Sequence, residues 1–149
     1  MYLLDTNVVS ELRRAKSGKA DKQVIAWAQS IPGTQFYLSA ISVLELELGV
    51  LLIERRDPPQ GTMIRTWLEK QVLPAFADRI IPIDVAVAKR CASLHVPDPC
   101  SERDALIAAS ALVHSLIVVT GNVNDFSSTG VTLLNPWEKR LSYPNQQPD

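Results

Sequence analysis

Four acidic residues stand beside apolar runs, where a carboxylate is unfavourable unless something binds it: Asp5, Glu45, Asp104 and Asp125. If the fold brings them together, two unit charges about 4 Å apart repel by about 4 kcal/mol at an effective dielectric of about 20. A hard divalent ion with oxygen ligands, Mg²⁺ or Mn²⁺, would remove that repulsion. Because such an ion activates water and neutralises phosphate charge, the pattern indicates phosphodiester hydrolysis.

Each acid also has an ordinary structural interpretation. Asp5 could cap a helix, Glu45 could form a buried salt bridge with an arginine, Asp104 could belong to a capping box with Ser101, and Asp125 could form a turn. Their joint placement favours a shared site. Two follow predicted strand ends, one lies in the first turn of a helix, and one lies on the flank of an apolar helical stripe.

The elements that must position these acids alternate along the chain. We expect strands at 2–4, 36–38, 80–83, 116–119 and 131–134, with the proline-containing strand 80–83 at an edge. We expect helices after Thr6 or Asn7, then at 21–29, from Ser39 or Ser42 to 54, and at 63–76, 85–95 and 103–114, with a loop at 55–61 and a short last helix from Pro136. This alternation predicts a three-layer α/β/α sandwich with a mostly parallel sheet, with a domain at 1–141 and a polar tail at 142–149.

Helical geometry distinguishes the acids of the segment from 39 to 54. At about 100° per residue, Glu45 lies beside Ile41, Leu48 and Leu52, whereas Glu47 points towards water. An ionised glutamate on a core-facing stripe requires a partner or a metal ion. We therefore expect Glu45 to be the inward carboxylate.

Composition limits the classes of function. A net charge of −1 and a pI of about 6.1 argue against coating nucleic acid by bulk charge. A basic cluster at 13–22 is a local patch or a solvated helix end with equal weight: Arg13, Arg14, Lys16, Lys19 and Lys22. The two cysteines have neither a disulfide framework nor a zinc spacing. With neither a signal peptide nor a membrane span expected, we predict a cytoplasmic protein.

Several catalytic classes lack their motifs. The sequence has no glycine-rich phosphate loop, and Asp5 is followed by Thr6 and Asn7 rather than by a second aspartate. His95 and His114 are isolated, and no serine or cysteine nucleophile is paired with them. A nucleotide triphosphatase and a phosphatase with an aspartyl nucleophile are therefore disfavoured.

The four acidic segments together resemble the PIN-domain family, and in particular VapC-type toxins of type II toxin–antitoxin systems, including the FitB-like branch. The matching segments are 4–12, 39–49, 104–109, 119–126, 129–131 and 135–137. The resemblance implies an endoribonuclease dependent on Mg²⁺ or Mn²⁺, with Asp5, Glu45, Asp104 and Asp125 as the metal site and Thr6 or Asn7, Thr120 and Asn122 in support. It also implies a homodimer and a VapB-type antitoxin, with DNA contacted only through that antitoxin.

One position departs from the family pattern. The family often has an arginine between the threonine and asparagine of its fourth motif, where this chain has Gly121. That difference concerns substrate affinity or local order rather than the metal site. A binding module with weak catalysis and a DNase of similar fold remain as alternatives, and the RNA target is open between transfer, ribosomal and messenger RNA.

Overall fold

Six short strands form one sheet in the computed structural model, which describes residues 1–138 and 140–142. The strands are β1 (Tyr2–Leu4), β2 (Phe36–Ser39), β3 (Ile80–Ile81), β4 (Ile117–Val119), β5 (Leu133–Asn135) and β6 (Arg140–Ser142). Their order is β3-β2-β1-β4-β5-β6. The first five are parallel, and β6 runs antiparallel to β5. Strand β3 lies at an edge, as the following Pro82 predicts.

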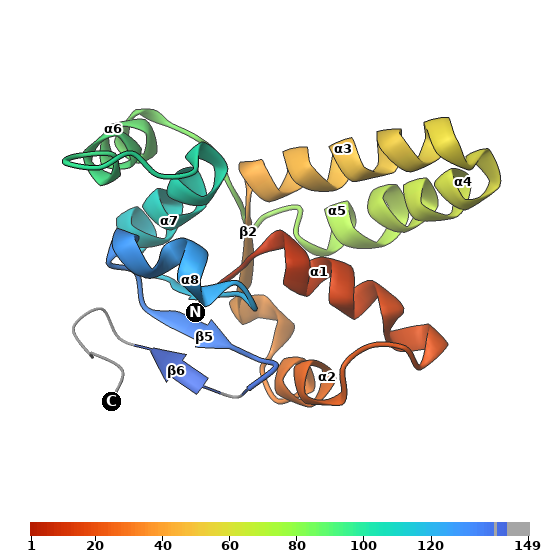
Figure 1. Cartoon of the computed structure of the whole chain (residues 1–149). Coiled ribbons are helices and arrows are strands. Elements are labelled where there is room, and N and C mark those ends of the chain that lie inside the picture. The colour runs from red at the N-terminus through yellow and green to blue at the C-terminus, as the bar shows by residue number, and fades with distance from the viewer. Residues whose placement is uncertain (139, 143–149) are drawn as a thin grey trace.

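Helices connect the parallel strands and cover the sheet (Figure 1). They are α1 (Thr6–Arg13), α2 (Lys22–Gln29), α3 (Ala40–Arg56), α4 (Pro58–Trp67), α5 (Leu73–Ala75), α6 (Val85–Leu94), α7 (Glu102–His114) and α8 (Val123–Phe126). A 3₁₀ turn at Arg14–Ser17 extends α1, and a π-helical turn at Leu68–Val72 joins α4 to α5. None of the helices in the described ranges is long and apolar enough to cross a membrane.

Side chains that alternate along the strands belong to two separate hydrophobic cores. Leu3 and Val118 belong to a core built with α7 and α8, whereas the next residues, Leu4 and Val119, belong to a core built with α1, α3 and α4. Successive side chains of a strand point to opposite faces, so apolar runs in a parallel sheet fill both sides. The prediction of a three-layer α/β/α sandwich is confirmed.

The predicted loop at 55–61 is wrong. Helix α3 continues to Arg56, and α4 begins at Pro58 after the single residue Asp57. Prolines are compatible with the first helical turn, where backbone N–H groups lack partners anyway. The two helices pack closely, since a Cβ on Gly61 would lie 2.5 Å from Glu54 Cα. Ion pairs from Arg65 to Glu47 at 2.6 Å and to Glu54 at 2.8 Å join them.

The short last helix predicted from Pro136 is also wrong. Residues 136–138 form a turn, which leads from β5 into β6. The Asn135 side chain accepts a hydrogen bond from the Trp137 backbone N–H at 3.0 Å, and Asn135 O accepts from the Glu138 N–H at 3.2 Å. Such an asparagine turn competes with a helix start. Of the predicted tail, Ser142 pairs in β6, and 143–149 lie outside the described residues.

Helix α3 carries apolar side chains on two faces. Ile41, Leu46 and Val50 are buried and face the sheet. A second stripe is exposed by between 38% and 59%: Leu44, Leu48, Leu51 and Leu52. The prediction that Leu48 and Leu52 belong to the core is therefore wrong, because helical periodicity identifies apolar faces but not which face meets the sheet.

Candidate metal centre

Asp5 is a buried acid at the carboxyl end of the central strand β1. It is 6% exposed and is the N-cap of α1, a position predicted for Thr6 or Asn7. Its Oδ1 accepts the Thr6 backbone N–H at 2.8 Å, and its Oδ2 accepts the Thr120 hydroxyl at 2.8 Å. Asp5 is thus both a helix cap and a candidate site residue.

Thr120 follows the neighbouring strand β4, so adjacent parallel strands deliver Asp5 and Thr120 to the same edge of the sheet. Thr120 Oγ1 also accepts the Asn122 backbone N–H at 3.0 Å and the Asn7 side-chain amide at 3.3 Å. The predicted supporting residues therefore form one hydrogen-bonded group around Asp5.

Glu45 lies on α3 and lines the same pocket as Asp5. Its Oε1 accepts the Thr6 hydroxyl at 2.8 Å. Arg103 Nη1 lies 3.7 Å from Glu45 Oε2, so Glu45 has the arginine partner that was the alternative to a metal ion. Arg103 is exposed, so this is not the buried salt bridge of that alternative. Glu47 is not simply solvated as predicted, because Arg65 binds it.

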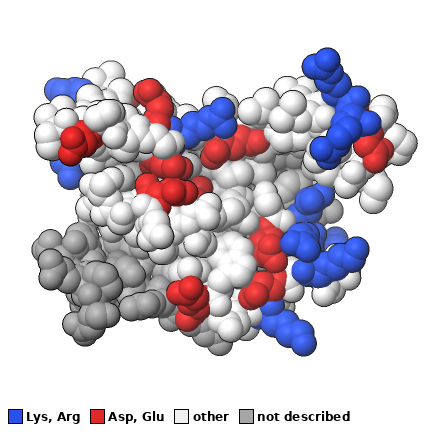
Figure 2. Space-filling model, viewed as in Figure 1, with Lys and Arg blue, Asp and Glu red and all other residues white. Residues whose placement is uncertain are grey.

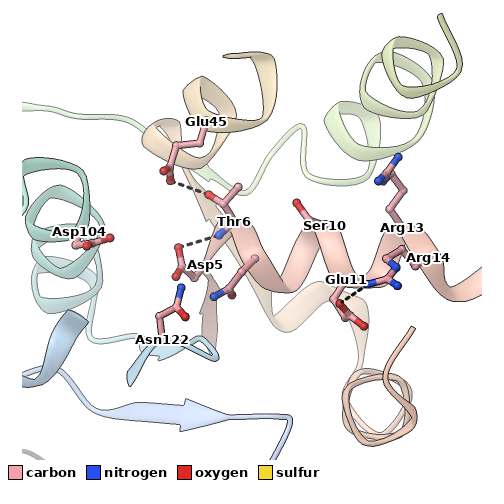
Figure 3. Close-up of a pocket in the computed structure, with 10 residues that line it drawn as sticks. Asp5, Thr6, Ser10, Glu11, Arg13, Arg14, Glu45, Asp104 and Asn122 are labelled. Atoms are coloured by element: carbon pink, nitrogen blue, oxygen red, sulfur yellow. Dashed lines mark hydrogen bonds and ion pairs between the residues drawn. The ribbon is translucent and has the colours of Figure 1, made fainter. Parts of the chain in front are cut away.

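The other two acids come from the second half of the chain. Asp104 lies in the first turn of α7, half-buried, and lines the pocket with Asp5 and Glu45 (Figure 3). Asp125 lies in the short helix α8 rather than in a loop, is exposed, and does not line this pocket. Its charge nevertheless acts on Asp104. Burial is the main cause that raises the pKa of Asp104, and the charges of Asp125 and Glu45 raise it further. A hydrogen bond from Ser101 lowers the pKa of Asp104 in part.

Burial raises the pKa of Asp5 to about 6. The hydrogen bonds from Thr120 and Thr6 oppose this shift, and the charges of Glu45 and Asp104 add to it. A carboxylate disfavoured by burial and by like charges is the electrostatic signature of a functional site. Burial is the main cause of the raised pKa of Asp5, and the charges of Glu45 and Asp104 are smaller contributions.

The donor set suits a hard cation, but the side chains are spread. Within the described residues, no three His, Cys, Asp or Glu side chains are close enough together to hold a metal ion. The carboxylates of Asp5 and Glu45 are instead turned towards Thr6 and Thr120. Asn7 Oδ1 is buried and has no hydrogen-bond partner among the described residues, so one further oxygen donor at the pocket is uncommitted. All these donors are oxygens, as Mg²⁺ prefers.

The pocket extends well beyond the acids. Its volume is about 470 Å³, and it continues along α1 past Ser10 and Glu11 to Arg13 and Arg14. Figure 3 shows Asp5, Glu45 and Asp104 at one end, and Arg13 and Arg14 with Glu11 at the other. From the sequence, the two arginines were predicted only as members of a basic cluster at 13–22. The spacing of Thr6, Ser10 and Arg13 along one helical face was the signal that could have placed them in this site.

Gly121 is explained by its contact with Trp137. A Cβ at Gly121 would lie 2.9 Å from Cε3 and from Cζ3 of the Trp137 ring, closer than side chains normally approach. Trp137 is itself packed against the core that contains α1 and α3. The arginine that the family often has would begin with that same Cβ. In this structure, a side chain at position 121 would therefore require the Trp137 ring to shift.

We expect Gly121→Ala to lower the free energy of unfolding by about 1–3 kcal/mol through overpacking. Combining it with Trp137→Phe, which removes the contacted part of the indole, should make the loss from Gly121→Ala smaller. Urea denaturation of the single and double variants measures this coupling, with Gly33→Ala as the control because nothing lies within 4 Å of its Cβ position. Strictly additive effects would contradict the packing explanation.

Comparison with known proteins agrees with the fold. The family model of the PIN domain matches residues 2–131. Toxin FitB of Neisseria gonorrhoeae is 38% identical over 143 residues, covering 92% of this chain and 99% of FitB. VapC ribonuclease Y4jK of Sinorhizobium fredii is 36% identical over 146 residues, covering 93% and 99%.

The crystal structure of FitAcB from Neisseria gonorrhoeae has a chain that superposes with a TM-score of 0.83 at 38% identity, covering 92% of this chain and 99% of that chain. The chain belongs to the PIN-domain family and, within it, to the VapC-type toxins that include FitB. The family prediction made from the acidic segments is confirmed.

Proposed function

We propose that this protein is a Mg²⁺- or Mn²⁺-dependent endoribonuclease and the toxin of a cytoplasmic toxin–antitoxin pair. The observation that carries the proposal is the buried Asp5 carboxylate. Two hydrogen bonds orient it, and its pKa is raised to about 6 beside Glu45 and Asp104. Relatives that span nearly the whole chain bear the names ribonuclease and toxin.

Asp5, Glu45 and Asp104 are the proposed ligands from the pocket, and Asp125 is the proposed ligand from its rim. Because no three of these carboxylates now converge, ion binding requires Glu45 and Asp104 to turn towards Asp5. The bound ion would supply Lewis acidity, lowering the pKa of a water molecule and neutralising charge on the phosphate.

The chain's own residues prepare the site. The Thr6 hydroxyl binds Glu45, which would give up that hydrogen bond to turn towards Asp5. Asp5 is already held in one orientation by Thr120 and the Thr6 backbone N–H. Preorganised ligands reduce the reorganisation needed at the moment of reaction. Neither histidine lines this pocket, and a direct attack of water on the phosphodiester needs no covalent intermediate.

We propose a VapB-type antitoxin as the partner, with DNA contacted through that partner. The support is the similarity to chains from structures described as FitAcB and as FitAB bound to an IR36 DNA fragment, at 38% and 36% identity. An acidic pocket suits a basic side chain of such a partner electrostatically.

The exposed stripe of α3, Leu44, Leu48, Leu51 and Leu52, supports the expected homodimer. Four leucines on one helical face form an apolar surface that a second copy could bury. Leu48→Asp is expected to shift the protein from dimer to monomer in sedimentation velocity, whereas Met63→Asp, at an exposed position on α4, should leave it dimeric. A monomeric wild type would contradict the dimer.

The catalytic proposal is tested with antitoxin-free protein and labelled structured and single-stranded RNA, with Mg²⁺, Mn²⁺ or EDTA. Metal-dependent cutting is expected, and it begins to define the substrate. Single-stranded DNA in parallel separates a ribonuclease from a DNase. Absence of cutting by folded protein that binds Mn²⁺ would favour a binding module with weak or lost catalysis.

A further inference from the structure

The end of the pocket opposite the acids is basic and lies on the same helix. Thr6, Ser10 and Arg13 follow one another at intervals of four and three residues, which places them on one face of α1. At 1.5 Å per residue, Arg13 lies about 10 Å along the helix from Thr6. About two or three nucleotides of a nucleic-acid strand cover this distance.

Arg13 lies over the ring of Trp67. Its guanidinium carbon lies 5.8 Å from the centroid of that ring, and Trp67 is packed against the core. A guanidinium attracted to an aromatic ring keeps N–H donors that can bind a phosphate. No carboxylate lies within ion-pair distance of Arg13 in the part of the chain that the structure describes.

Arg14 is fixed differently. Its Nη1 lies 3.5 Å from Glu11 Oε2, and Glu11 Oε1 accepts the Asp21 backbone N–H at 2.7 Å. Glu11 therefore orients Arg14 and ties the end of α1 to the start of α2. Glu11 pairs with Arg14 alone, so Arg13 leaves the basic end of the pocket with a net positive charge.

The surrounding surface extends that charge. Lys16, Lys19 and Lys22 are exposed on the turn after α1 and at the start of α2. Figure 2 shows carboxylates in the middle of this face and basic side chains gathered over the far end of α1. If the phosphate that reacts lies beside Asp5, Glu45 and Asp104, the neighbouring phosphates of the same strand need positive charges elsewhere on the protein.

We propose that Arg13 and Arg14 bind a backbone phosphate of the RNA about two or three nucleotides from the phosphate that is cleaved. This inference rests on the proposed nuclease function and adds a positioning role to it. The arginine fork matches the geometry of phosphate oxygens, and Trp67 and Glu11 preorganise the pair. Contacts of this kind fix register without reading bases.

The test measures RNA binding in the Asp104→Asn background by fluorescence anisotropy, with a labelled single-stranded RNA, Mn²⁺ and a series of KCl concentrations. We expect Arg13→Gln with Arg14→Gln to weaken binding by at least about tenfold. The magnitude of the slope of log affinity against log salt should fall by about 0.7, the value for one phosphate contact on a single strand. The loss should be equal for RNAs of unrelated sequence.

Matched variants isolate the site. Lys89→Gln with Arg90→Gln removes the same charge from exposed positions on α6 and should leave the salt slope unchanged. Arg13→Lys keeps the charge without the fork and should bind with intermediate affinity. In protein with intact Asp104, the double arginine variant should raise KM with little change in kcat, because the contact is made equally in substrate and transition state.

The outcomes separate this inference from the proposed function. RNA that binds with an arginine-dependent salt slope but is not cut by the wild type supports the phosphate contact and contradicts the nuclease. RNA that is cut, with affinity and slope unchanged in the arginine variant, overturns the phosphate contact alone. In that case, weaker binding of an acidic antitoxin segment by the variant would assign the basic end to a protein partner.

Discussion

Asp104→Asn is expected to reduce metal-dependent RNA cleavage by at least about 100-fold while the protein folds as the wild type does. Loss of a residue that merely supports a metal ligand typically reduces activity or metal affinity by 10- to about 100-fold, so a direct ligand should matter at least as much. Asparagine keeps the shape of the side chain and removes its charge. Initial rates of cleavage with Mn²⁺ measure the loss of activity, and far-ultraviolet circular dichroism measures whether the variant is folded.

The matched control is Glu102→Gln, two residues earlier on α7. Both acids lie in the first turn of the helix and interact favourably with its dipole. Glu102 is exposed and does not line the pocket, so its variant should cleave at nearly the wild-type rate. Unchanged cleavage by Asp104→Asn, or an equal loss in both variants, would contradict the assignment of Asp104.

Asp5→Asn is expected to stabilise the metal-free protein at neutral pH. The pKa of Asp5 is raised to about 6 from an ordinary value of 3.8, chiefly by burial. The folded state therefore holds a proton that the unfolded state releases between these two values. The contribution of Asp5 to the free energy of unfolding falls as pH rises from about 4 to about 6, and stays low above that.

The gap between the two pKa values corresponds to roughly 3 kcal/mol, which is an upper bound for the gain. We expect an increase of about 1–3 kcal/mol at pH 7.5 and a smaller one at pH 4.5, from urea denaturation in EDTA. Excess Mn²⁺ should stabilise the wild type and have little effect on the variant, because only the native site binds the ion.

Asp84→Asn provides the control, since Asp84 caps α6 by accepting the Val87 N–H at 3.0 Å. Asparagine caps helices as well as aspartate does, so this variant should change stability little at either pH. Destabilisation by Asp5→Asn at pH 7.5 would mean that the hydrogen bonds to Asp5 outweigh its burial. Stabilisation of the metal-free protein by Asp5→Asn, together with stabilisation of the wild type alone by Mn²⁺, would mean that ionised Asp5 lowers the free energy of unfolding unless it binds a cation.

Three of the four predicted acids, Asp5, Glu45 and Asp104, line one pocket, as the elements expected to carry them indicated. Asp5 and Thr120 come directly after apolar runs, and runs of that kind form neighbouring parallel strands whose ends meet. Asp125 was expected in a loop, whereas it lies in the four-residue helix α8 and outside the pocket lining. A segment that short carries no periodic pattern that could predict a helix.

Two of the incorrect predictions share a cause. The α3–α4 connection and the turn after β5 both contain proline, which is compatible with a helix start and with a turn. Close packing of Gly61 on Glu54 selects a helix in the first case, and pairing of β6 with β5 selects a turn in the second. These deciding contacts lie outside the local segments.

By itself, the sequence determined the alternation of strands and helices, the parallel sheet and the set of acids at its edge. Period and propensity act over a few residues, so they can be recognised locally. Only the tertiary structure decided that Thr120 holds Asp5, that Trp137 excludes a side chain at position 121, and that Trp67 holds Arg13 over the pocket. Each of these contacts joins segments that are distant in the sequence. They depend on how whole elements pack together, which no local sequence pattern encodes.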